Sequence, residues 1–155
     1  MPTTFVEGDL FQTANLRAFA HGCNCAGAMG KGIAVEFRAR FPRMYDAYKA
    51  RCAAGLFAPG DVFTWREGDL TVFNLGTQKT WRSKALLPAI KTSVAKMIEE
   101  AEAMGLSEVG LPRIGAGLGG LEWATVRELL AELGAKTRVN LLVFEKHLPA
   151  ALLNR

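Results

Sequence analysis

Residues 18–41 read AFAHGCNCAGAMGKGIAVEFRARF, and this stretch decides which class of fold the sequence can adopt. The short apolar run at residues 18–21 is typical of a buried strand, and a glycine-rich turn follows it. Residues 32–41 then carry apolar side chains at helical spacing, and Pro42 ends that helix. A strand that enters a helix through glycines is the repeating unit of an α/β fold.

The rest of the chain continues the alternation of strands and helices. Strands are predicted at residues 4–7, 61–66, 70–75, 108–111 and 139–144, and helices at residues 42–54, 83–104 and 121–133. The nearly continuous apolar run at 139–144 is typical of a strand whose sheet is covered on both faces. The sequence therefore predicts one α/β domain over residues 1–155, with helices in the two outer layers.

Composition and charge exclude several classes of protein. Half of the 155 residues are hydrophobic and 22% are charged, which indicates a folded chain. No apolar run approaches the roughly 18 residues of a membrane helix, and no signal peptide is recognisable, so a cytoplasmic protein is expected. The three cysteines and two histidines lack metal-site spacing, so we expect reduced thiols and neither a metal nor a redox cofactor.

The charge distribution leaves two interpretations open. The net charge is +4, and no acidic residue occurs from Leu70 to Ile98. This segment is either a solvated face or a surface for an anionic partner.

Two glycine-rich loops are the candidate ligand-binding elements. Loop 1 (residues 27–34) and loop 2 (residues 112–120) each follow a predicted strand and lead into a helix. Glycines permit positive φ angles and close backbone approach, so successive N–H groups can converge on an anion. Either loop could be only a tight turn, but two of them in one small domain suit a diphosphate. Neither is a Walker loop, and loop 2 lacks the acidic residue about 20 positions further on that a dinucleotide fingerprint needs.

Three segments of the sequence resemble those of the macrodomain family, which binds ADP-ribose. They are Gly8-Asp9-Leu10-Phe11, Asn24 with Met29-Gly30-Lys31-Gly32-Ile33-Ala34, and Pro112-Arg113-Ile114-Gly115-Ala116-Gly117-Leu118. The resemblance covers nearly the whole chain, and these motifs occur in the order that is typical of the family. The chain is most similar to the branch of the terminal ADP-ribose glycohydrolase, and within it to the macrodomains of DarG antitoxins. The resemblance implies a three-layer α/β/α macrodomain with a central mixed sheet.

The resemblance also implies a set of ADP-ribose-binding residues. Asp9 would accept a hydrogen bond from the adenine amino group, although an Asp at this position can also simply cap a turn. Asn24 would lie near the distal ribose, and Phe144 would lie against adenine or pack in the core. The predicted set is Asp9, Leu10, Asn24, Met29, Gly30, Gly32, Ile33, Ile114, Gly115, Ala116, Gly117, Leu118 and Phe144.

The segment 74–82 is expected to supply the reactive group, because the resemblance places a lysine there that reaches the distal ribose. Lys79 is the predicted catalytic residue and Lys84 the alternative, while an ungapped match puts the family lysine near Gln78. A lysine with a lowered pKa could attack the anomeric carbon C1″ and open the ribose to a Schiff base. A protonated lysine could instead stabilise the leaving group.

Loop 2 departs from the pattern of the human enzyme of this branch. That enzyme carries an Asp that helps to resolve the lysine adduct, and Gly119 stands at the corresponding position here. Glu122 lies nearby in sequence and could replace it, or could merely favour the helix dipole.

The resemblance implies a hydrolase that removes ADP-ribose from thymidine bases of DNA. It would serve in DNA repair and as antitoxin to a DarT-type DNA ADP-ribosyltransferase. Trp81, Arg82 and Lys84 are the predicted nucleic-acid surface, since an aromatic ring can stack on a base and cations bind phosphates. Trp81 could instead close the core.

Other functions stay open at this point. They are hydrolysis of ADP-ribose from Glu or Asp side chains, dephosphorylation of ADP-ribose 1″-phosphate, binding of ADP-ribose without turnover, and plain nucleic-acid binding. A monomer is expected, which could be the N-terminal part of a longer antitoxin.

Overall fold

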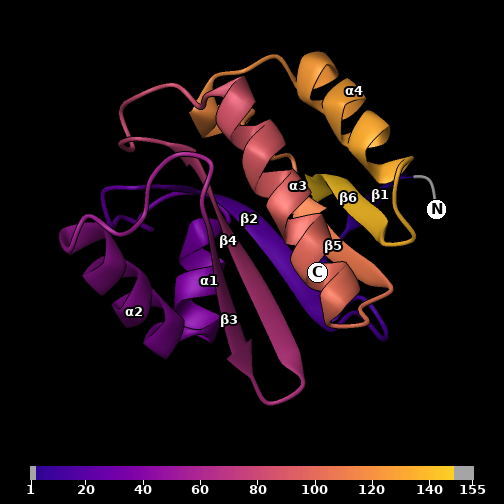
Figure 1. The fold of residues 1–155 in the computed structure, drawn as a ribbon, viewed down its shortest axis with the longest axis horizontal. Helices are drawn as coiled ribbons and strands as arrows, with labels where there is room; N and C mark the ends of the chain where they lie inside the picture. The colour runs from indigo at the N-terminus through magenta and orange to yellow at the C-terminus, as the bar shows by residue number, and fades with distance from the viewer. Residues whose placement is uncertain (1–2, 149–155) are drawn as a thin grey trace.

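The computed structural model describes residues 3–148, which form one six-stranded sheet with helices on both faces (Figure 1). The strands are β1 (Thr4–Gly8), β2 (Ala18–Asn24), β3 (Val62–Glu67), β4 (Leu70–Gln78), β5 (Glu108–Pro112) and β6 (Asn140–His147). Their order across the sheet is β1-β6-β5-β2-β4-β3. All neighbours are parallel except β3, which forms an antiparallel hairpin with β4. The sheet is therefore mixed, as predicted.

Four helices complete the outer layers. They are α1 (Ala34–Arg40), α2 (Pro42–Ala53), α3 (Leu87–Ala103) and α4 (Trp123–Gly134), with two short 3-10 turns, η1 (Leu10–Gln12) and η2 (Gly117–Gly119). Helices α3 and α4 lie together on one face of the sheet (Figure 1). No helix within residues 3–148 combines the length and the apolar character needed to cross a bilayer.

The sheet divides the hydrophobic core into two halves. One half joins the sheet to α3 and α4 and includes the fully buried Ile90, Met97 and Leu130. The other joins it to α1 and α2 and includes the fully buried Phe37 and Tyr48. Apolar burial on both faces stabilises the three layers, and the predicted α/β/α architecture is confirmed.

Two predicted boundaries are wrong in ways that matter for the site. Helix α3 begins at Leu87 rather than near residue 83, because residues 80–83 form a turn closed by Thr80 and Ser83 side chains. Pro88 lies in the first turn of α3, where a proline is tolerated because its missing N–H would have no partner within the helix. Strand β4 continues to Gln78 instead of ending at residue 75, because it stays paired with the end of β2.

The parallel strands bring distant segments to one edge of the sheet. Loop 1 follows β2 and loop 2 follows β5, so both leave from the carboxyl ends of neighbouring parallel strands. The segment after β4 leaves from the same edge, next to β2. Ligands of open α/β sheets bind at this edge, which makes it the place to look for a site.

Candidate active site

Two adjoining cavities lie at the carboxyl edge of the sheet. The first, of about 390 Å³, is lined by the end of β2, loop 1 and the segment after β4. The second, of about 320 Å³, lies between loop 1 and loop 2. Gly22, Lys31, Ala34 and Gln78 line both. A larger hollow of about 800 Å³ lies at the opposite end of the sheet and carries neither glycine loop, so the two smaller cavities are the candidate site.

Residues of both loops that line the cavities carry unused N–H groups. In the part of the chain that the structure describes, the N–H groups of residues 30–33 donate to no protein acceptor. The same holds there for the N–H groups of Gly115 and Gly117. Gly115 has a φ of 75° and Gly117 a φ of 61°, values that favour glycine. Converging N–H groups of this kind can hold phosphate oxygens from two sides.

The side chain of Asn24 shapes loop 1. Its Oδ1 accepts hydrogen bonds from the N–H groups of Ala26 (3.0 Å) and Ala28 (3.3 Å) and from the hydroxyl of Tyr48 (3.1 Å). Its Nδ2 donates to the carbonyl of Ala28 at 2.8 Å. Burial raises the pKa of Tyr48, so this phenol stays a donor. Asn24 lines the first cavity, but its observed role is to position the loop.

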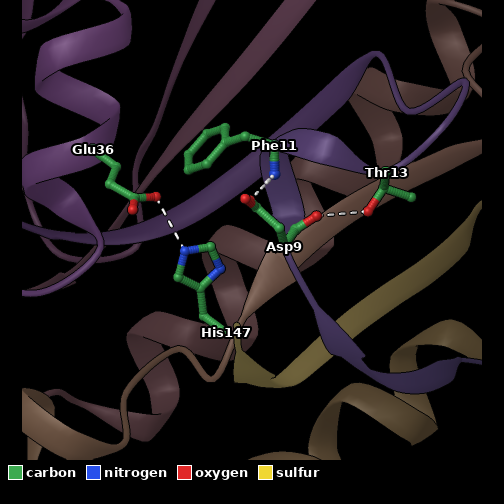
Figure 2. A network of polar contacts seen from close by, with 5 residues as sticks. All are labelled: Asp9, Phe11, Thr13, Glu36 and His147. Carbon is green, nitrogen blue, oxygen red and sulfur yellow. Dashed lines mark hydrogen bonds and ion pairs between the residues drawn. The ribbon is translucent and has the colours of Figure 1, made fainter. Parts of the chain in front are cut away.

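Asp9 caps the turn that follows β1, which is one of the two roles predicted for it. Its Oδ1 accepts a hydrogen bond from the N–H of Phe11 at 2.9 Å, and its carbonyl accepts one from Thr13 Oγ1 at 2.9 Å. Figure 2 shows these residues beside Glu36 and His147, whose side chains meet at 3.1 Å. A carboxylate can accept several hydrogen bonds, so contact with adenine stays a prediction.

The apolar members of the predicted set differ in exposure. Leu10, Met29 and Phe144 are buried, and Phe144 packs into the core half on the side of α1 and α2. Ile33 is half-buried and lines the second cavity, as does the buried Ile114. The structure thus brings the residues of both loops together, whereas Phe144 has the packing role that was the alternative for it.

The predicted lysines lie outside the cavity walls. Lys79 and Lys84 are exposed and line neither cavity. Gln78, immediately before Lys79, lines both, as does Lys31. The ungapped match to the family was the sequence signal that Gln78 could lie in the site. No sequence signal indicated that the side chain of Lys31 would line it.

Loop 2 packs closely around position 119. The N–H of Ala85 donates to the carbonyl of Gly119 at 2.8 Å, and a Cβ at position 119 would lie 3.0 Å from Ala85 Cβ. Glu122 is exposed at the start of α4 and does not line either cavity. Among residues 3–148, no carboxylate lines the two cavities, so an acid–base partner of the predicted kind is missing there.

Trp81 lies at the mouth of the first cavity between two cations. Its side chain is 50% exposed, so it does not close the core. Lys31 Nζ lies 5.4 Å from the centre of its ring, and the Arg82 guanidinium carbon lies 4.6 Å from it. Lys79 and Lys84 form no ion pair within the described residues. We call the exposed surface of Trp81, Arg82, Lys79 and Lys84 the rim. It combines an accessible aromatic ring with unpaired positive charge.

The cysteines are not suited to nucleophilic chemistry. Cys23, Cys25 and Cys52 carry no disulfide. Burial raises the pKa of Cys25 to about 12, and it also raises the pKa values of Cys23 and Cys52, so the thiols stay protonated at neutral pH. Over the range 3–148, no three His, Cys, Asp or Glu side chains gather as a metal site would require.

Comparison with known proteins finds a matching family model and several similar chains. The model of the family described as "Macro domain" matches residues 20–130. A "DNA ADP-ribosyl glycohydrolase" of Mycobacterium tuberculosis is 34% identical over 131 residues, 82% of this chain and 37% of that protein. Its counterpart in Thermus aquaticus is 32% identical over 146 residues, 91% of this chain and 40% of that protein. This chain thus spans about two fifths of the length of these relatives.

A solved structure extends the comparison to three dimensions. The "Macrodomain of Mycobacterium tuberculosis DarG" superposes with a TM-score of 0.83 at 30% identity, and the match covers 95% of this chain and 99% of that one.

Proposed function

This chain belongs to the macro domain family, and on that premise we propose that it is a hydrolase that removes ADP-ribose from DNA. The observation that carries the proposal is the pair of glycine loops that line one cavity together and carry unused N–H groups. Two donor sets suit the two phosphates of ADP-ribose. The similarity to relatives named DNA ADP-ribosyl glycohydrolases supports the hydrolytic activity and the DNA substrate.

The positively charged rim supports DNA as the carrier of the ADP-ribose group. Trp81 offers a half-exposed ring for a base, and Arg82 and Lys84 offer cations for neighbouring phosphates. We propose the modified thymidine base as the substrate and a DarT-type DNA ADP-ribosyltransferase as the toxin whose product is removed. In this role the chain is the macrodomain of a cytoplasmic antitoxin, contributes to DNA repair and works as a monomer.

Turnover of defined substrates tests the function. The protein is incubated in parallel with an oligonucleotide ADP-ribosylated on thymidine, a protein ADP-ribosylated on Glu, and ADP-ribose 1″-phosphate. We expect release of ADP-ribose from the oligonucleotide to be faster by at least about tenfold. Faster release from the protein or the phosphate would favour the corresponding alternative. If calorimetry shows that the protein binds ADP-ribose but none of the three substrates is cleaved, the protein is a non-catalytic ADP-ribose-binding protein.

Lys79 is the proposed source of positive charge at the reacting end, with Lys84 as the alternative. Lys79→Ala should lower the rate of release by about tenfold or more, because a positive charge near the leaving group is lost. ADP-ribose affinity should change little. Lys91→Ala, which removes an exposed lysine on α3 away from the cavities, is the matched control. If Lys79→Ala turns over like this control while Lys84→Ala does not, the role belongs to Lys84.

Asp9 is the proposed acceptor for the adenine amino group. Asp9→Ala should weaken ADP-ribose binding by about tenfold or more, since a hydrogen bond to a charged group contributes about 1.5–3 kcal/mol. Isothermal titration calorimetry measures this affinity. The variant also loses a turn cap, so its melting temperature is measured alongside. Asp69→Ala, in the hairpin between β3 and β4, removes an exposed carboxylate as a control. Unchanged affinity in Asp9→Ala would remove the adenine role.

A further inference from the structure

The side-chain amide of Gln78 has a single possible orientation. Its Nε2 donates to the carbonyl oxygens of Thr80 and Ser83, both at 2.9 Å. Carbonyl oxygens only accept hydrogen bonds, so the nitrogen must be on that side and Oε1 on the other. Both amide hydrogens are used, and the amide plane is held by two contacts to one turn.

Gln78 Oε1 is an acceptor without a donor in the described part of the chain. It lies toward loop 2, 3.5 Å from where a Cβ at Gly119 would stand. Gln78 is one of the residues that line both cavities, at the place where they adjoin.

The other side-chain oxygens of the described cavity walls are already engaged. Asn24 Oδ1 accepts three hydrogen bonds, and Thr77, which is only 1% exposed, donates from Oγ1 to the carbonyl of Cys23 at 3.3 Å. The cationic groups on these walls, Lys31 and Arg113, only donate. Gln78 Oε1 is therefore the side-chain oxygen there that is available to a ligand or a water.

The order of the strands puts Gln78 far from the predicted adenine end. Asp9 follows β1 at one edge of the sheet, and Gln78 ends β4, four strands away in the order β1-β6-β5-β2-β4. At about 4.8 Å per strand the separation is about 19 Å. The loops that would hold the phosphates follow the strands in between, β5 and β2. A ligand with adenine at Asp9 and phosphates at both loops extends its distal ribose toward Gln78.

We infer that Gln78 is a catalytic residue whose Oε1 orients the water that attacks C1″ of the distal ribose. This inference rests on the proposed function. The water oxygen bonds to C1″ as the bond from C1″ to the base breaks, and the electron pair leaves with the base. One proton of the water is transferred through solvent to the departing base, so the products are ADP-ribose and the unmodified base. No lysine adduct forms, and Lys79 acts from the rim through its charge alone.

The position of the neighbouring groups agrees with this direct attack. A Cβ at position 119 would press on Ala85 Cβ at 3.0 Å, and the glycine there supplies no acid to resolve a lysine adduct. A neutral amide at 78 and a glycine at 119 stand where the adduct chemistry would need an amine and a carboxylate.

Single-turnover kinetics on an oligonucleotide ADP-ribosylated on thymidine test the inference. Gln78→Ala should lower the rate constant of release by about 100-fold, because a misplaced attacking group costs about that factor. Its affinity for free ADP-ribose should stay within about threefold of the wild type. A rate equal to that of the wild type, or a loss of affinity that accounts for the whole rate defect, would overturn the inference.

Ser83→Ala separates the role of the oxygen from support of the turn. This change removes the hydrogen bonds between Ser83 Oγ and Thr80 that hold the same turn, but keeps the two backbone carbonyls to which Gln78 Nε2 donates. We expect its rate to stay within about threefold of the wild type. A loss as large as that of Gln78→Ala would mean that Gln78 only supports the turn.

Reductive trapping tests the absence of a lysine adduct. The wild-type reaction run with borohydride should show no protein of increased mass in an intact-mass spectrum. An adduct on Lys79 or on another lysine would overturn direct attack. Absence of any release by the wild type would remove the proposed function together with this inference. Release by the wild type that Gln78→Ala leaves unchanged would remove the inference alone.

Discussion

Lowering the pH from 6.5 to about 4 is expected to reduce the free energy of unfolding by about 3 kcal/mol through His21 alone. Burial lowers the pKa of His21 from 6.5 to about 4 in the folded protein. Above 6.5 the imidazole is neutral in both states, so the contribution is fully present. As the pH falls toward 4, the unfolded chain binds a proton that the folded chain excludes, and stability is lost.

The surroundings of His21 explain why it stays neutral. The side chain is fully buried, and its ring stacks on that of Phe37 with centroids 3.9 Å apart. Asn74 Nδ2 donates to the carbonyl of Phe63, which turns Asn74 Oδ1 toward the histidine. His21 Nε2 therefore donates to this oxygen at 2.7 Å. This one hydrogen bond favours the charged form less than burial disfavours it.

Urea unfolding between about pH 6.5 and pH 4.5 measures the effect. The control is His21→Gln, which keeps an amide donor for Asn74 but has no titrating group. The decline in stability with falling pH should be clearly shallower in this variant than in the wild type. Parallel declines would show that His21 is not the source. Carboxylates titrate in both proteins, so the comparison removes their contribution to the pH dependence of stability.

Gly115→Ala is expected to destabilise the protein by about 2–4 kcal/mol and to abolish most ADP-ribose binding. Gly115 has a φ of 75°, and a residue with a side chain is strained there by about 1–2 kcal/mol. An added Cβ would clash with the Cδ1 methyl of Ile90, which is fully buried. Overpacking of this kind costs about 1–3 kcal/mol. Relief of the clash displaces loop 2 and its N–H groups.

Gly117→Ala is the matched control in the same loop. Its φ is 61°, so the backbone strain is similar, but no atom lies within 4 Å of the added Cβ. We expect a loss of about 1–2 kcal/mol from strain alone. Thermal unfolding and calorimetry with ADP-ribose compare the two variants. Equal destabilisation would contradict the role assigned to the contact with Ile90.

The architecture was predictable because its signals are local. Apolar periodicity identified each strand and helix within a few residues, and glycines identified both loops before any partner was known. The start of α3 was missed because Thr80 and Ser83 close a turn with their own side chains, and this local bonding competes with a helix. The sequence also could not decide whether Asn24 and Phe144 support the structure or contact a ligand, since both residue types suit either role.

The identity of the residue that enters the cavity was not predictable in the same way. Successive side chains of a strand point to opposite faces, so a shift of one position exchanges Gln78 with Lys79. Cys23 pairs with Gly76 but Asn24 pairs with Gln78, an irregularity that inserts one residue at the end of β4. This register depends on β2, more than 50 residues away in the chain.

The sequence by itself therefore determined the α/β/α order, the positions of the two glycine-rich loops and the family resemblance. Each of these depends on residues close together in the chain, where hydrophobic spacing and the backbone freedom of glycine act directly. Only the tertiary structure decided that Gln78 and Lys31 line the cavities, that Lys79 lines neither of them, and that Gly119 packs closely against Ala85. Those outcomes depend on strand register and on contacts between segments far apart in sequence, which no local pattern encodes.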